Sequence, residues 1–175
     1  MKTILLEDFL HHQDFYINEA KTGKIFVYPT DTIYGIGWIY IPENVEKIFT
    51  IKQRDEKKMF SIIAPNFEWI KKKYPEADIE TLKKHLETYH WVTYIFSYEQ
   101  PGVRIIKHPI QKFVEALGEP FITTSCNISW EQIVIDVKNI PEEIASKVDY
   151  IIDGGIGWGK PSVLIDLVVN KIIER

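Results

Sequence analysis

The chain has 175 residues, of which 45% are hydrophobic and 26% are charged, and its formal net charge is −4. This length and composition are typical of one soluble globular domain, which we expect to span residues 1–175. The negative charge argues against sequence-blind nucleic-acid binding over the whole surface, and no run of about 18 apolar residues suggests a membrane span. Early acids and histidines exclude a secretory signal, and the single cysteine, Cys126, cannot form an internal disulfide. We therefore expect a cytoplasmic protein.

Predicted helices and strands alternate along the chain without a linker or a repeat. Helices are expected at 5–20, 42–53, 66–73, 78–89, 109–117 and 141–147. Strands are expected at 24–28, 33–40, 59–64, 91–98, 102–107, 121–124 and 148–152, with two more after a glycine-rich loop. This alternation predicts one mixed α/β domain.

The stretch 28–37, YPTDTIYGIG, carries more hydrogen-bonding side chains than a turn needs. Thr32 and Tyr34 belong either to a capped turn or to one wall of a site. For Thr30 and Asp31 the interpretation as ordinary turn caps stays open.

Three cationic side chains admit two interpretations each. Lys52 and Arg54 come at the end of the predicted helix 42–53, where basic residues offset the helix dipole but could also hold an anion. Arg104 lies within a predicted strand, between Val103 and Ile105. It either faces solvent from an edge strand or projects into a pocket.

Two polar loops follow strands. The segment 123–129, TTSCNIS, is either a turn or a ligand-contacting loop that uses its hydroxyls and its amide. The segment 153–166 fits a phosphate loop except at Pro161, where that motif needs Ser or Thr before a helix, so we reject it. A flexible loop that brings Ser162 to a site edge fits better. Cys126 is interpreted as a small buried residue, because no histidine is near it in sequence, and the histidine spacing predicts no metal site.

In their order along the chain, these segments resemble one family. YPTDTIYGIG, KQR, GVRIIKHP, TTSCNIS and PSVLID are similar to successive blocks of the YrdC-like proteins, the threonylcarbamoyl-AMP synthases, over about residues 20–175. The resemblance implies a single α/β domain of the short type, with a twisted mixed sheet and flanking helices around a concave, basic cavity.

The resemblance also implies an activity. The family makes threonylcarbamoyl-AMP and pyrophosphate from L-threonine, bicarbonate and ATP, with Mg²⁺ accompanying ATP, for the modification of tRNA. The tRNA and a threonylcarbamoyl-transferase complex are the implied later partners. Its implied catalytic residues are Lys52 and Arg54, its threonine-binding residues Thr32, Tyr34, Arg104, Ser125 and Ser162, and its nucleotide-binding residues Arg54, Lys58, Asn127 and Ser129.

The chain departs from the family pattern in three segments, which bear on activity more than on fold, and in one of them Cys126 stands where the family has alanine. Asp55 stands where the family has proline, and 88–93, TYHWVT, keeps only Val92 and Thr93 of another block. One alternative is therefore a non-catalytic protein that binds double-stranded RNA or tRNA through phosphate contacts. Its basic residues would be Lys47, Lys52, Arg54, Lys57 and Lys58. Another is a carbamoyl-transfer role, as in hydrogenase-maturation proteins, which would need additional domains.

Overall fold

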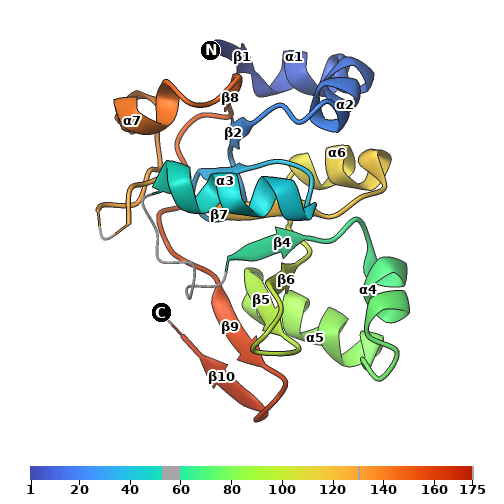
Figure 1. The fold of residues 1–175 in the computed structure, drawn as a ribbon. Helices are drawn as coiled ribbons and strands as arrows, with labels where there is room; N and C mark the ends of the chain where they lie inside the picture. Colours follow the sequence, from blue (N-terminus) through green and yellow to red (C-terminus); the bar gives the residue numbers. More distant parts are fainter. Residues whose placement is uncertain (53–59, 130, 175) are drawn as a thin grey trace.

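A twisted mixed sheet of ten strands runs through the part of the chain that the computed structural model describes, residues 1–52, 60–129 and 131–174 (Figure 1). The strands are β1 (Lys2–Leu5), β2 (Phe26–Tyr28), β3 (Gly35–Gly37), β4 (Ser61–Ile63), β5 (Val92–Ile95), β6 (Gly102–Arg104), β7 (Phe121–Ser125), β8 (Tyr150–Asp153), β9 (Val163–Asp166) and β10 (Lys171–Ile173). Their order across the sheet is β1-β8-β2-β3-β7-β4-β6-β5-β9-β10. The predicted α/β class and mixed sheet are confirmed.

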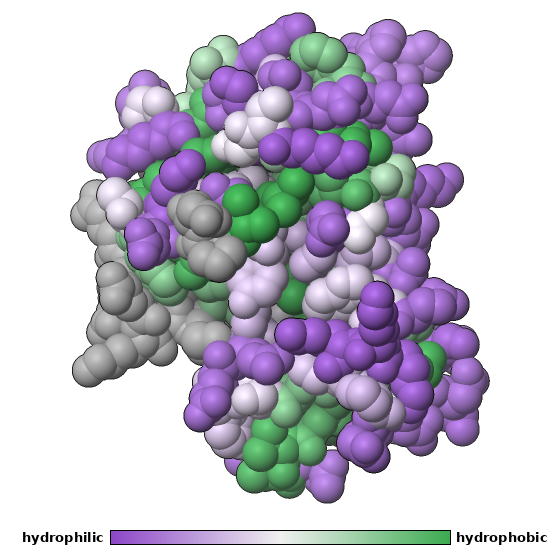
Figure 2. Space-filling view, turned by 45° about the vertical axis from the view of Figure 1, so that its right-hand side comes forward, coloured by the Kyte–Doolittle hydropathy of each residue, from purple (hydrophilic) through white to green (hydrophobic). Residues whose placement is uncertain are grey.

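The described helices flank this sheet. They are α1 (Leu6–His11), α2 (Gln13–Lys21), α3 (Pro42–Lys52), α4 (Phe67–Lys73), α5 (Ile79–Tyr89), α6 (Ile110–Leu117) and α7 (Glu142–Ala145). Figure 1 shows α1, α2 and α6 in the upper half of the molecule and α4 and α5 beside the lower strands. Figure 2 shows hydrophilic side chains over most of one face, with hydrophobic residues gathered centrally and at the lower end. No described helix is long and apolar enough to cross a membrane.

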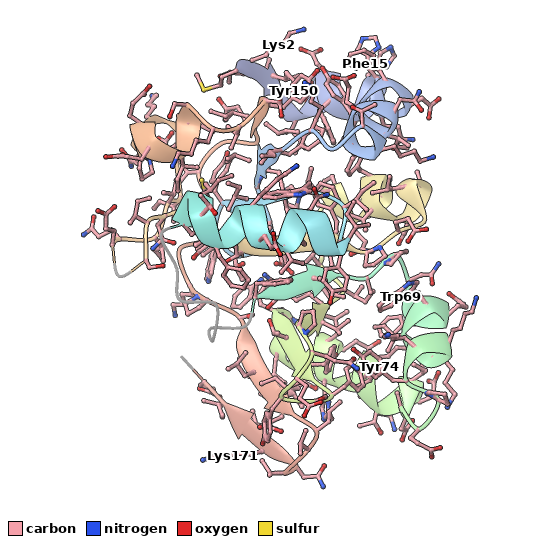
Figure 3. The ribbon with its side chains drawn as sticks, in the orientation of Figure 1. Lys2, Phe15, Trp69, Tyr74, Tyr150 and Lys171 are labelled. Atoms are coloured by element: carbon pink, nitrogen blue, oxygen red, sulfur yellow. The ribbon has the colours of Figure 1, made fainter. Side chains whose placement is uncertain are left out.

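Aromatic rings hold α1 and α6 against the upper strands. Phe113 of α6 lies 4.9 Å from Phe9 of α1 and 5.7 Å from Phe121 of β7, measured between ring centroids. All three are buried, so each removes a large apolar surface from water. In the stick view of Figure 3, Tyr150 of β8 lies at the same end as Lys2 of β1, and Lys171 of β10 lies at the opposite end.

The beginning of the chain corrects one prediction. Instead of a single helix over 5–20, the chain forms β1, α1 and α2, with a break at His12. β1 pairs parallel with β8, with Lys2 opposite Tyr150. Only Ile4 of β1 is buried, so the strand shows no alternation that could reveal it in the sequence.

The other predicted elements are present and mostly shorter. β3 covers three residues of the expected strand 33–40, and α6 ends at Gly118 with a positive φ of 75°, as a C-terminal glycine should. Residues 163–166 form a strand, which confirms the rejection of a phosphate loop. The buried side chains at the end of α3 are Ile51 and Lys52.

Candidate functional site

A cavity of about 320 Å³ opens over the middle strands of the sheet. Its wall combines the turn before β3 with residues from β4, β5, β6 and β7 and from the loop before β9. Hydroxyl groups dominate the polar lining, from Thr32, Ser61, Thr93, Thr123, Ser125 and Ser162. β7, β4, β6 and β5 are neighbours in the sheet, so segments distant in sequence meet here. Pockets of roughly 300–1,000 Å³ are typical of small-molecule sites.

Arg104 lines this cavity from an interior strand, which settles its predicted ambiguity. β6 lies between β4 and β5, so Arg104 is not on an edge strand, and its side chain is 8% exposed. Its Nη2 donates to Asp31 Oδ1 at 2.5 Å, and its Nη1 lies 3.4 Å from Thr32 Oγ1. The Nε–H is buried without a hydrogen-bond partner in the described part of the chain. The guanidinium therefore retains unused donor capacity.

Asp31 corrects the interpretation of this residue as an ordinary turn cap. Both carboxylate oxygens bond to distant residues: Oδ1 to Arg104, 73 positions away, and Oδ2 to the backbone N–H of Lys107, 76 positions away. Its side chain is 3% exposed. Arg104 is the cation among the described lining residues, and Asp31 balances its charge. The basic character of the cavity stays a prediction.

Thr30, in contrast, is a turn cap in this structure. Its Oγ1 donates to the Ile33 carbonyl at 2.7 Å and accepts from the backbone N–H groups of Thr32 and Ile33. It also lies 2.9 Å from Thr32 Oγ1. The turn therefore holds Thr32, which is 1% exposed, at the cavity wall.

Tyr34 is one of the residues that line the cavity, and its hydroxyl is engaged with the glycine-rich loop. The hydroxyl donates to the Gly155 carbonyl at 2.7 Å and accepts from the Gly154 N–H at 3.0 Å. Burial raises the pKa of this hydroxyl to about 12, so it stays neutral. Tyr34 thus ties the glycine-rich loop to the turn, and Gly159 donates from the same loop to the Thr32 carbonyl. Its role as a threonine contact stays a prediction.

The glycine-rich loop brings Ser162 to the cavity, as predicted. The Ser162 hydroxyl lies 2.7 Å from that of Thr93 on β5, and both are buried. The sequence identifies Thr93 only as a residue that is kept from the family pattern and predicts no role for it. This contact joins residues 69 positions apart and is not visible in the sequence.

Lys52 is buried at the end of α3 and meets the loop after β7. Its ammonium donates to the Ser125 carbonyl, and it lies 3.2 Å from Ser125 Oγ and 3.5 Å from Asn127 Oδ1. Ser129 caps the same helix end, since its backbone N–H and its hydroxyl donate to the Lys52 carbonyl. The structure therefore brings Lys52, Ser125, Asn127 and Ser129 together, next to the cavity wall that Ser125 forms.

Two predicted site residues, Arg54 and Lys58, lie outside the described residues, as do Asp55 and Lys57. In the described part of the chain, no group of three or more His, Cys, Asp or Glu side chains could hold a metal ion. The predicted Mg²⁺ therefore stays an expectation tied to ATP.

Cys126 is buried, as predicted, and burial raises the pKa of its thiol to about 12. A thiol that stays protonated is a poor nucleophile.

The described cavity can bind and orient an anionic, hydroxyl-bearing ligand, and its chemistry is that of positioning and charge balance.

Comparisons with known proteins fit this site. A family model named Sua5_yciO_yrdC, described as telomere recombination, matches residues 18–175. A putative threonylcarbamoyl-AMP synthase from Methanocaldococcus jannaschii is 32% identical over 175 residues, covering 92% of this chain and 83% of that protein. The threonylcarbamoyl-AMP synthase of Pseudoalteromonas translucida is 26% identical over 172 residues, covering 87% of this chain and 91% of that protein.

Among solved structures, P. abyssi Sua5 complexed with L-threonine has a TM-score of 0.79 to this chain at 22% identity. The match covers 96% of this chain and 55% of that one, so this chain spans about half the length of that Sua5. At this identity the likeness shows a shared fold.

Proposed function

Because the chain belongs to the Sua5/YciO/YrdC family, whose model matches residues 18–175, we propose that it is a threonylcarbamoyl-AMP synthase. The reaction joins L-threonine, bicarbonate and ATP into threonylcarbamoyl-AMP and releases pyrophosphate and water. The names of the curated relatives and the L-threonine bound to P. abyssi Sua5 support this choice.

The observation that carries the proposal is the contact of the buried side chains of Arg104 and Thr32 in a hydroxyl-rich cavity. A guanidinium offers several N–H donors in a planar fork that matches a carboxylate. Because the Arg104 side chain is largely removed from water, this recognition is stronger than at the surface. Thr32 and Ser162 supply the hydroxyls suited to the polar groups of threonine.

The reaction needs no protein nucleophile. With its carboxylate held by Arg104, threonine attacks the bicarbonate carbon through its amine, and hydroxide leaves as water after protonation. The resulting carbamate oxygen attacks the α-phosphorus of ATP, the bond to the β-phosphate oxygen breaks, and pyrophosphate leaves. Mg²⁺ enters with ATP as part of the substrate.

Lys52 is the described cation nearest to the loop of Ser125 and Asn127. We assign it to the charge of the carbamate and the α-phosphate, with Asn127 and Ser129 beside the nucleotide. Arg54 and Lys58 keep their proposed nucleotide roles on the strength of the family pattern alone. The product would then pass to a transferase that modifies tRNA.

The test is a labelled-bicarbonate assay. Purified protein is incubated with L-threonine, Mg-ATP and ¹⁴C-bicarbonate, and both pyrophosphate and labelled nucleotide are measured. We expect both products to need all three substrates and to fall to background in Arg104→Ala. If pyrophosphate or phosphate is released equally with and without bicarbonate and threonine, the protein hydrolyses ATP by a different activity and the proposal is overturned.

A further inference from the structure

Arg104 and Thr32 form one end of the cavity, and a residue outside the lining supports this end from behind. Asp31 is buried and is not among the described lining residues, whereas Arg104 is. One Asp31 oxygen holds the Nη2 edge of the guanidinium, and the other accepts from the Lys107 N–H. The carboxylate is thereby held at both oxygens, and its charge-assisted hydrogen bond holds the Nη2 end of the guanidinium in turn.

Such a pair is not explained by stability. A buried ion pair loses the hydration of both charges, and replacing the pair with apolar residues is often neutral or stabilising. Asp31 therefore has a better explanation in the site it supports. It leaves the Nη1 side of Arg104 next to Thr32, where the cavity wall lies.

Thr30 determines whether the Thr32 hydroxyl donates or accepts a hydrogen bond on each side. The short contact from Thr30 Oγ1 goes to the Ile33 carbonyl, which can only accept, so the Thr30 proton is used there. The 2.9 Å contact between the two threonine hydroxyls is then best satisfied with Thr32 as the donor. The lone pairs of Thr32 Oγ1 remain as acceptors, consistent with the Arg104 nitrogens 3.4 and 3.5 Å away.

We propose that Thr30 and Asp31 are positioning residues that set a fixed donor, Arg104, beside a fixed acceptor, Thr32. This inference rests on the proposed function and deepens it. The pair matches an α-amino acid, whose carboxylate accepts from Arg104 and whose amine donates to Thr32. An amine held through its N–H keeps its lone pair for the attack on bicarbonate. The arrangement discriminates against an α-keto acid of the same size, which has no donor for Thr32.

The chain offers a matched control in Asp149. That carboxylate also bonds one cation, Lys24, and one backbone N–H, that of Ile25. Its side chain is 36% exposed and is not among the described lining residues. Asp149→Asn thus makes the same chemical change to the same kind of contact outside the site.

The experiment titrates L-threonine and, separately, Mg-ATP into each variant by calorimetry. Asp31→Asn should weaken L-threonine binding by about tenfold to a hundredfold, the range for a charge-assisted hydrogen bond, and change ATP binding by less than about twofold. Thr30→Val should weaken threonine binding similarly, Thr30→Ser should preserve it, and Asp149→Asn should change neither ligand. A 2-keto analogue of threonine, which has no donor for Thr32, should bind the unaltered protein at least about tenfold more weakly than threonine.

Each outcome of these titrations either supports or overturns the proposal. If the unaltered protein does not bind threonine, the proposed function fails and this inference falls with it. If it binds threonine but Asp31→Asn and Thr30→Val bind it equally well, the inference alone is wrong. Equal loss of threonine and ATP affinity with a lowered melting temperature would show a merely structural role. If Asp31→Asn does not fold, the nearly isosteric Thr30→Val tests the same network without changing a charge.

Discussion

Two aspartates in this molecule make the same contacts in opposite surroundings. In the inner pair, Asp31 bonds Arg104 and a backbone N–H, and the two side chains are 3% and 8% exposed. In the outer pair, Asp149 bonds Lys24 and a backbone N–H, and the side chains are 36% and 43% exposed. The outer pair ties the two residues before β2 to the residue before β8.

The difference shows where charge serves function. An exposed pair loses little hydration and contributes little, because water and salt screen it. A buried pair loses the hydration of both ions, so it is weak evidence for stability and stronger evidence for a site. The inner pair lies where hydroxyls from several segments converge on a cavity, and the outer pair does not.

Breaking the inner pair from one side should have the largest effect. Arg104→Ala leaves Asp31 buried without its cation, and we expect a loss of about 3–5 kcal/mol in unfolding free energy together with loss of threonine binding. Urea denaturation and threonine titration measure the two effects. A variant as stable as the unaltered chain would show that the Asp31 carboxylate is not held as described.

Removing both charges sharpens the comparison. Asp31→Leu combined with Arg104→Met should recover most of the stability lost in Arg104→Ala, because no buried charge is left unpaired. Threonine binding should stay absent, since the fork that holds the carboxylate is gone. Restored threonine binding in this double variant would contradict the role of the pair.

A second buried cation tests whether the site extends beyond the inner pair. Lys52 is 2% exposed and bonds Ser125, so Lys52→Met should lower the unfolding free energy by about 1.5–3 kcal/mol, the range for hydrogen bonds to a charged group. Product formation should fall to background while threonine binding changes little. Activity that survives this change would remove Lys52 from the reacting end of the site.

A buried group without a charge should behave differently. The Cys126 thiol has a pKa raised to about 12 by burial, so below that value it stays neutral. At about pH 8 we expect iodoacetamide to label it slowly in the folded protein and rapidly after denaturation, because only the thiolate reacts. Cys126→Ala should keep full synthase activity. Fast labelling of the folded protein would indicate an accessible, activated thiol.

Breaking the outer pair should have the smallest effect. Lys24→Gln should leave the melting temperature and threonine binding within error, because the ammonium is exposed and screened. Raising the salt concentration should change neither result. A loss comparable to that of Arg104→Ala would mean that burial does not separate the two pairs.

The elements of the fold could largely be read from the sequence because their signals are local. Asn66 and Asp78 cap α4 and α5, and Gly118 ends α6, so residues next to these boundaries in the sequence predict them. β1 was missed because its pairing with β8 is a contact across the whole chain. Its single buried residue, Ile4, gives no period.

The residues of the site also fall into those that local sequence predicts and those that depend on distant contacts. The hydroxyl-rich segments predicted a wall, and Thr32, Ser125 and Ser162 line the cavity. The role of Asp31 could not be predicted, since both its partners are more than 70 positions away and depend on how β6 pairs within the sheet. The face that Arg104 takes follows from that pairing too.

The most direct test is the crystal structure of the protein grown with saturating L-threonine. The account predicts threonine in the cavity, with its carboxylate within hydrogen-bond distance of Arg104 and its amine nitrogen within that distance of Thr32 Oγ1, while Asp31 keeps its hold on Arg104. An empty cavity, or threonine bound away from Arg104, would contradict it.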